Sequence, residues 1–307
     1  MPKRKIIKSK KTLSVFIIVF LLLVSLLING LGNGFDWDKT AKTLGVSEKN
    51  EFDKYPINVH FVDVGQGDCT LITSSFGTVL VDSGESDEKM NVENYLDGLK
   101  IEKIDCLILT HPHSDHCGSM SYIVDNYEIG KFYMSEIDEE NLPTSKCYEN
   151  LLTSLDKEKV DCEYLHCGDR FNIGEITCET FGPVDASESL NSMSLVLKFS
   201  YKGFSVLISG DAEADEEKDI LKKGFDLSAD ILKVGHHGSS TSSSAKFLDA
   251  VNPQYAVISL GKNNKYNHPH KQTIDKLNKR NIKYFRTDES STVVFSYDLN
   301  QIIVNSR

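Results

Sequence analysis

The sequence predicts an α/β domain over residues 56–307, in which short apolar strands alternate with helices. Apolar runs at 57–62, 104–110 and 204–209 have the length and the branched residues of buried strands. Four strand ends also lead directly into residues of metal-ligand or turn type. Because sheet-and-helix proteins carry their chemistry at the carboxyl ends of strands, these residues mark the expected site. The four residues are Asp82, His111, Asp211 and His236.

The first half of the domain is expected to begin with three strands joined by tight turns. Apolar residues at 57–62, 69–73 and 78–81 predict the strands, and glycines lie in the turns between them. The elements predicted after them are a helix at 89–99, a strand at 104–110, a helix at 118–126, a strand at 131–134, a helix at 144–155 and strand-like pieces between 160 and 180.

The second half is expected to open with a hairpin whose turn contains Lys202 and Gly203. A helix at 213–223 follows, with acidic residues in its early turns, lysines in its last turn and Gly224 as its C-cap, which matches the helix dipole. The other predicted elements are hairpin strands at 193–200 and 204–209, a strand at 231–234, a helix ending at 250 that the serine run 239–244 caps, a strand at 255–260, a helix at 271–280 and a closing hairpin at 292–297 and 302–304.

The most specific pattern in the chain is His111-Pro112-His113-Ser114-Asp115-His116, directly after the strand at 104–110. Its three imidazoles and one carboxylate are ligands that suit zinc or a similar borderline metal. A single histidine would more often be structural. This spacing after a buried strand is far more specific and predicts a metal site.

Two aspartates beside glycine turns have two interpretations. Asp68 ends the turn at 63–68, and Asp82 follows the strand at 78–81. Aspartate next to glycine commonly serves turn geometry alone. Alternatively, Asp82 lies beneath the metal site and hydrogen-bonds a ligand histidine, as carboxylates around metal sites do.

The first 34 residues differ in character from the rest of the chain. Basic residues as far as Lys11 precede an apolar run at 13–31. As a helix this run would be about 28 Å long, close to the hydrocarbon thickness of a bilayer. The basic flank is expected to stay in the cytoplasm, which places the domain outside the cell membrane. The run is either an uncleaved anchor, which its length favours, or a cleaved signal segment, and residues 35–55 are expected to form a linker.

The charge outside this segment limits the possible partners. The rest of the chain has 28 basic and 45 acidic residues. Its net charge of −17 opposes extended binding of a polyanion. We therefore expect no stable nucleic-acid binding, and a phosphate-containing substrate would be held locally by metal. Among the seven cysteines, Cys162 and Cys167 could pair, Cys69 and Cys106 are expected to be buried, and Cys117 is expected near the metals without ligating them.

Six motifs in order resemble the metallo-β-lactamase-fold hydrolases, and among them the extracellular hydrolase domain of the competence protein ComEC. The resemblance extends from about residue 55 to the C-terminus. It implies a four-layer αββα sandwich with the metal site at one edge. The matching segments are 61–68, 80–84, 109–116, 207–211, 232–239 and 267–269.

The resemblance also implies two divalent metal ions, zinc or manganese. His236 is favoured over His237 to complete the second metal site. Where the family has a further histidine, this chain has Asn191, whose amide is a poorer ligand and would weaken the first site. The other implied ligands are His111 and His113 for the first ion, Asp115 and His116 for the second, and Asp211 as the bridge between them.

The function that the resemblance implies is hydrolysis of a phosphodiester, with DNA or a related molecule as the substrate. Metal ions lower the pKa of bound water and polarise a phosphoryl oxygen. Asp82, Asp115 or His268 could then transfer protons, with His268 lying either in the cleft or in a surface loop. A related branch of the family implies choline- or teichoic-acid diesters of the cell wall instead.

Two further classes of function remain open. A non-catalytic competence or cell-surface accessory protein with a degenerate site would explain Asn191, although the intact histidine motif favours an enzyme. A β-lactamase or thioester hydrolase has no specific support in the sequence. Metal uptake by the purified protein would separate the accessory protein from the enzyme.

Overall fold

The computed structural model describes residues 52–306, all of which belong to one compact unit. The predicted anchor or signal segment at 1–34 and the predicted linker up to residue 51 lie outside these residues. Within 52–306, no helix is both long enough and apolar enough to span a bilayer. The described residues thus correspond to the predicted hydrolase domain and the end of the linker.

The first of two mixed sheets contains eight strands. Neighbours are antiparallel from β15 (Ile302–Ser306) to β3 (Gly77–Val81) and parallel from β3 to β6 (Cys162–Leu165). Between these, in spatial order, lie β14 (Val293–Tyr297), β1 (Ile57–Phe61) and β2 (Thr70–Ser74), and then β4 (Lys103–Leu109) and β5 (Glu128–Ser135).

The second sheet contains seven strands. Neighbours are parallel from β13 (Lys283–Arg286) to β10 (Phe204–Ile208) and antiparallel from β10 to β7 (Arg170–Ile173). The remaining strands, in spatial order, are β12 (Tyr255–Ile258) and β11 (Ile231–Lys233), and then β9 (Val196–Tyr201) and β8 (Ile176–Gly182).

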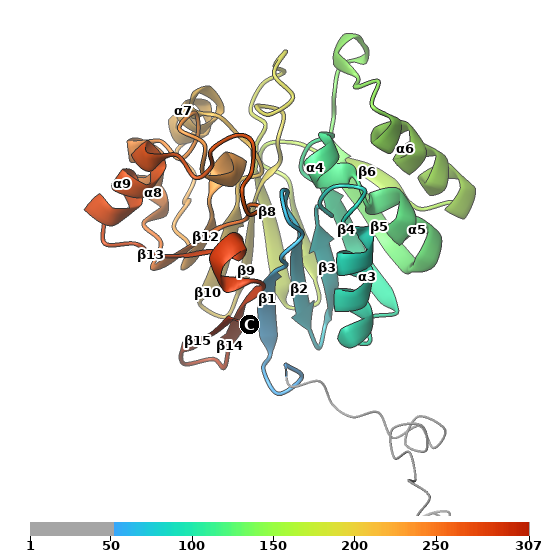
Figure 1. Ribbon diagram of the computed structural model, residues 1–307, viewed down its shortest axis with the longest axis horizontal. Coiled ribbons are helices and arrows are strands. Elements are labelled where there is room, and N and C mark those ends of the chain that lie inside the picture. The colour runs from blue at the N-terminus through green and yellow to red at the C-terminus, as the bar shows by residue number, and fades with distance from the viewer. Residues whose placement is uncertain (1–51, 307) are drawn as a thin grey trace, which may run out of the picture. The chain divides into compact units, whose positions relative to one another are not determined.

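Helices cover the outer face of each sheet, and Figure 1 shows the two groups on opposite sides of the strands. Apolar residues of the first group pack on the first sheet, and those of the second group on the second sheet. The predicted four-layer αββα sandwich is therefore confirmed. The first group is α3 (Lys89–Gly98), α4 (Ser114–Cys117), α5 (Met120–Asn126) and α6 (Lys146–Glu158), and the second is α7 (Ala214–Lys223), α8 (Ala245–Val251) and α9 (Lys271–Lys279).

The strands read as continuous apolar runs because both of their faces are buried. In β4, Cys106 and Ile108 point into the core between the sheets, whereas Leu107 and Leu109 point towards the helices. This division follows from the two-residue period of a strand. The adjacent β3 divides in the same way, so the sandwich has one core between the sheets and one beneath each helical layer.

The structure differs from the sequence prediction at two places. The helix expected at 118–126 begins earlier as α4 and is interrupted before α5. At the interruption, a Cβ on Gly118 would lie 2.4 Å from the backbone nitrogen of Ser86, so the close approach of a distant loop requires glycine. In addition, β13 and the short helix α10 (Thr287–Ser290) were not predicted.

All seven cysteines are free thiols. Cys69 and Cys106 are buried, as predicted, and Cys162 and Cys167 are not joined. Cys117 is also buried, and its Sγ lies 3.2 Å from Sγ of Cys147 at the start of α6.

Candidate metal centre

The candidate site lies where four strands of the two sheets end. His111 follows β4 and Asp82 follows β3 in the first sheet, while Asp211 follows β10 and His237 follows β11 in the second. The helix α4, near the upper edge of the domain in Figure 1, begins within the histidine motif. Gly210 has a φ of +49°, and a Cβ there would lie 2.9 Å from Ser194. Because residue 210 is glycine, the end of β10 can approach Ser194 closely.

One group of ligand-type atoms is formed by His111, His116 and Asp211, whose donor atoms lie within 4.8 Å of one another. His116 Nε2 is 3.4 Å from Asp211 Oδ1, and His111 Nε2 is 3.9 Å from Asp211 Oδ2. His113 joins this group, since its Nδ1 is 2.9 Å from His111 Nε2. His111 and His116 thus converge on the carboxylate of Asp211, and His113 lies against His111.

A second group contains Asp115, His116 and His237. His237 Nε2 lies 3.2 Å from Asp115 Oδ2 and 3.7 Å from Asp211 Oδ2. His116 belongs to both groups, and Asp211 lies next to both. These two groups are adjacent, and two further groups among the described residues, both of which contain Asp68, overlap with them.

The structure places His237, and not the sequence-favoured His236, in the second group. Both residues have left-handed backbone conformations, with φ of 51° and 50°, inside the short helix η2 (Gly235–Gly238). His237 points inward and is buried, whereas 23% of the His236 side chain is exposed. His236 Nε2 still lies 3.6 Å from Asp211 Oδ2, and its Nδ1 lies 3.7 Å from Glu213 Oε1. His236 therefore borders the site from the solvent side.

Asp82 holds the histidine motif from behind. Its Oδ1 accepts a hydrogen bond from the Thr110 backbone nitrogen at 2.8 Å, and its Oδ2 accepts one from Thr110 Oγ1 at 2.7 Å. His116 Nδ1 lies 2.8 Å from Asp82 Oδ2, which leaves His116 Nε2 facing Asp211. Asp82 is fully buried and does not line the cleft. This placement fits the orienting role better than proton transfer to a substrate.

Asp68 lies beside His237, whose Nδ1 is 3.0 Å from its hydrogen-bond partner, the carbonyl oxygen of Ser259. Asp68 Oδ1 lies 3.3 Å from His237 Nδ1, and Asp68 Oδ2 lies 2.7 Å from Nζ of Lys233. Lys233 is fully buried in β11 and also donates to the carbonyl oxygen of Val234. Lys233 was not among the predicted site residues, although a lysine inside an apolar strand is itself a signal, because a buried ammonium requires a partner.

The charges of the site favour a bound cation. Burial opposes ionisation of Asp211, but the neighbouring His237 and His116 hold the pKa of this carboxyl well below its ordinary value. Burial likewise opposes protonation of His237, but Asp211, Asp68 and Asp115 raise its pKa to about 10. Within residues 52–306, His116 Nε2, His237 Nε2 and Asp211 Oδ1 are buried and have no hydrogen-bond partner. Unpartnered imidazole and carboxylate atoms that converge in this way fit divalent metal ions.

A cleft of about 300 Å³ opens onto these two groups. Asn191 borders it, and Asn191 Oδ1 is buried without a hydrogen-bond partner among the described residues. His268 also borders it, which answers whether that residue lies in the cleft or in a surface loop. The residues that line the cleft are His113, Ser114, Asp115, Asn191, Asp211, His236, His237, Tyr266 and His268.

The serine run at 239–244 does not line this cleft. The backbone nitrogens of Ser243 and Ser244 donate to Glu217 of α7, and Ser244 Oγ caps α8 by accepting from the Phe247 nitrogen. The run therefore serves helix capping, as its sequence allowed, and joins α7 to α8.

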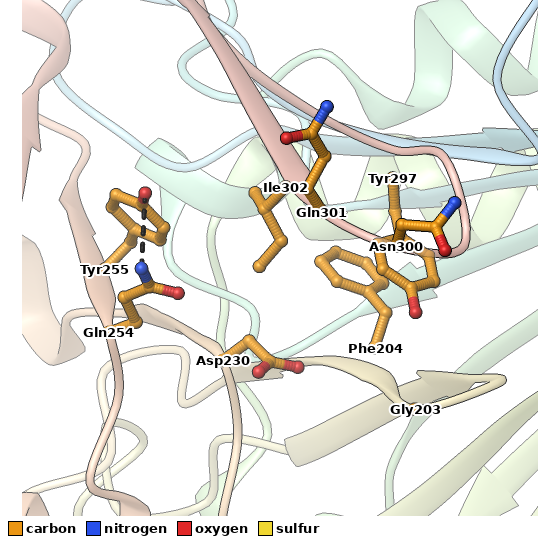
Figure 2. A pocket seen from close by; sticks show the side chains of 9 residues that line it. All are labelled: Gly203, Phe204, Asp230, Gln254, Tyr255, Tyr297, Asn300, Gln301 and Ile302. Atoms are coloured by element: carbon orange, nitrogen blue, oxygen red, sulfur yellow. Dashed lines mark hydrogen bonds between the residues drawn. The ribbon is translucent and has the colours of Figure 1, made fainter.

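A second cavity, of about 390 Å³, lies at the other end of the second sheet. Figure 2 shows Phe204, Asp230 and Tyr255, which stand at or just before the starts of β10, β11 and β12. The candidate metal ligands follow the opposite ends of β10 and β11. This cavity is therefore separate from the metal cleft.

Comparison with known proteins identifies similar sequences. The profile of the Metallo-beta-lactamase superfamily matches residues 62–262. The ComE operon protein 3 of Bacillus subtilis is 29% identical over 78% of this chain and 33% of its own length. The competence protein ComA of Neisseria gonorrhoeae is 30% identical over 76% of this chain and 31% of its own length. The chain thus spans about a third of the length of these curated relatives.

A solved structure shows the same fold in a protein described as a hydroxylase. CmlA, a diiron β-hydroxylase from Streptomyces venezuelae, superposes with a TM-score of 0.55 at 13% identity, over 88% of this chain and 59% of that chain. At this identity the likeness concerns the fold alone. A hydrolytic function must therefore be argued from the site and not from the sandwich.

Proposed function

This chain belongs to the metallo-beta-lactamase superfamily, and from that membership we propose that it is a metal-dependent phosphodiesterase that acts on DNA or a related diester. The observation that carries the proposal is the pair of adjacent ligand groups that share His116 and meet at Asp211 beneath an open cleft. Two donor sets side by side suit reactions in which both the attacking and the leaving oxygen need charge stabilisation.

We assign the ligands by their positions in the two groups. His111 and His113 would hold one ion, Asp115, His116 and His237 the other, and Asp211 would contact both. Two bound zinc or manganese ions supply an activated water near neutral pH and neutralise charge on a phosphoryl group. Asp82 would fix the orientation of His116, and the carbonyl oxygen of Ser259 would fix that of His237.

Residues of the cleft would position the substrate. Asp115 and His268 both border the opening and are available to hold or move a proton near the reacting phosphate. The likeness to a relative named as a competence protein is what supports DNA as the substrate class. A diester of choline or of a teichoic acid is the related alternative.

The test is an assay of the purified full-length chain with added zinc or manganese. Bis(p-nitrophenyl) phosphate, single-stranded DNA, p-nitrophenylphosphorylcholine and nitrocefin together cover the competing substrate classes. We expect metal-dependent turnover of a phosphodiester that Asp211→Ala reduces by about 10³ or more, because that substitution removes the shared ligand. Asp230→Ala, at the opposite end of β11, is the matched control and should keep its activity. Turnover of nitrocefin while every phosphodiester stays inert would reject the proposal.

Asn191 favours a second candidate, a non-catalytic accessory protein. A neutral amide stands in the cleft where a histidine would complete the first ligand group. Failure of the purified chain to take up zinc or manganese on titration would favour this candidate over the enzyme.

We also propose that the domain acts outside the cell membrane and is attached through the apolar run at 13–31. The chain should then fractionate with membranes, and protease added to intact protoplasts should digest the domain. Protection of the domain while the membrane is intact would refute this orientation.

A further inference from the structure

Tyr266 lines the candidate metal cleft and is partly exposed to solvent. The exposed fraction of this residue is 46%. No other residue that lines the cleft is among the large exposed hydrophobic residues of the described chain. An aromatic ring that contributes little to the core and faces a reaction site is available to a ligand.

The Tyr266 ring packs on His268, and His268 packs on His237, one of the candidate metal ligands. The Tyr266 and His268 rings are stacked, with centroids 5.6 Å apart and an interplanar angle of 23°. His268 in turn is nearly parallel to His237, at 6.3 Å and 28°. The three rings therefore form a row from the solvent to a member of the second ligand group.

The loop that carries the row is held by one side chain. Asn264 Oδ1 accepts from the His268 backbone nitrogen at 2.9 Å, and Asn264 Nδ2 donates to the carbonyl oxygen of His268 at 2.8 Å and to that of Gly261 at 3.1 Å. These three bonds place the Tyr266–His268 segment before any ligand arrives, which lowers the entropic cost of binding there.

We propose that Tyr266 is a stacking platform for a nucleobase next to the cleaved phosphate, so that the substrate is a single-stranded nucleic acid. The inference rests on the proposed phosphodiesterase function. Aromatic rings bind bases of any sequence through their π-faces, whereas the bases of a duplex are already stacked on one another. A platform of this kind adds local affinity in a domain whose net negative charge opposes long-range attraction of the strand.

Lys265 distinguishes this ligand from a choline head group. Its Nζ lies over the Tyr266 ring, 5.1 Å from the ring centroid, so a ligand that stacks on that face would displace this exposed side chain. A quaternary ammonium on the same ring would be repelled by this charge, whereas a nucleotide would place its phosphate near Lys265 and its base near Tyr266. The pair therefore favours a nucleotide over a cationic head group.

The experiment compares a single-stranded oligonucleotide with the same oligonucleotide carrying abasic sites. Binding is measured by fluorescence anisotropy in the presence of chelator, and cleavage is measured with added metal. We expect the wild type to prefer the base-bearing strand. Tyr266→Leu should lose about 5- to 100-fold on that strand and little on the abasic one, whereas Tyr266→Phe should keep the preference. Tyr164→Leu, at an exposed tyrosine of β6 that does not line the cleft, is the matched control.

The binding and cleavage arms separate failure of this inference from failure of the proposed function. Base-dependent binding that requires Tyr266, without cleavage of any strand, would keep the platform and reject the phosphodiesterase. Cleavage that Tyr266→Leu leaves unchanged, or reduces equally on base-bearing and abasic strands, would overturn the platform. Selective loss of p-nitrophenylphosphorylcholine turnover in Tyr266→Leu would overturn it as well, in favour of a choline site.

Discussion

Asp82 adopts a left-handed backbone conformation, with φ of 59°. Its two carboxylate oxygens form hydrogen bonds with Thr110 and His116. Asp82→Asn keeps the size of the side chain but replaces one acceptor oxygen with a donor. We expect metal affinity to fall by about 10- to 100-fold while the fold is retained, as for other residues that orient metal ligands. Competition with a chromophoric chelator measures the affinity.

Asp230→Asn is the control for that substitution. Asp230 Oδ2 also accepts a backbone hydrogen bond, from the Ser205 nitrogen at 2.8 Å, but it lies at the other end of the second sheet. Equal losses of metal affinity in the two variants would show that Asp82 acts through general stability and not through His116.

We expect Asn191 to make the two proposed metal positions unequal. An amide oxygen is a weaker zinc ligand than imidazole, so one ion should be lost on dialysis of the wild-type chain. Asn191→His should raise the metal content after dialysis from about one ion towards two per chain. Elemental analysis measures the content, and two ions retained by the wild type would contradict the expectation.

His60 links stability to pH at a distance from the proposed ligands. It is fully buried in β1, between Tyr95 Oη at 2.8 Å and Thr73 Oγ1 at 3.1 Å, and burial lowers its pKa from 6.5 to about 3. Between these two values the unfolded chain binds a proton that the folded chain does not, so stability falls as the pH falls. At about pH 5 this difference in pKa lowers the free energy of unfolding by about 2 kcal/mol.

The check on His60 is urea unfolding at several pH values for the wild type and for His60→Gln. The variant should lose about 2 kcal/mol less than the wild type between neutral pH and about pH 5. Parallel pH profiles in the two proteins would show that His60 does not carry this part of the acid sensitivity.

At the scale of elements, η2 turns two neighbouring histidines to different environments. We expect His237→Ala to lower metal affinity by at least about 100-fold, since it removes a ligand, and His236→Ala to have a smaller effect, since His236 borders the site from solvent. The two variants are matched controls for each other in the same metal titration. A larger effect from His236→Ala would restore the ligand that the sequence favoured.

The order of strands and helices was largely predictable because each element carries a local signal. Neighbouring residues show the apolar run of β4, the acidic start of α7 and Gly224 at its end. The break between α4 and α5 was not predictable, since it depends on the approach of Gly118 to Ser86. The mixed polar sequence of β13 likewise gave no local period.

The candidate site was likewise predictable where its residues are neighbours in sequence, and not where it depends on contacts between distant segments. The histidine motif was recognisable because its ligand types are neighbours in sequence, and Asp82 because it ends a strand. The inward turn of His237 depends on two consecutive left-handed residues, which no propensity indicates for histidine. The pairing of Lys233 with Asp68 joins segments from different sheets and is visible only in the fold.

At the scale of the whole molecule, the proposed ligands come from both sheets. His111, His113, Asp115 and His116 follow the first sheet, whereas Asp211 and His237 follow the second. Bound metal would therefore stabilise the contact between the halves of the sandwich. At metal concentrations about 100 times Kd we expect Tm to rise by roughly 5–10 °C in calorimetry. Asp211→Ala should abolish this rise, and an unchanged Tm in metal-loaded wild type would argue against ligands from both sheets.

The division of the ligands between the sheets has a consequence for biosynthesis. A nascent chain that has completed only its N-terminal half possesses the histidine motif but neither Asp211 nor His237. Such an intermediate presents an incomplete donor set and would hold metal weakly. The chain would bind metal tightly only after the second sheet has packed against the first. Metal binding would therefore stabilise correctly folded molecules selectively.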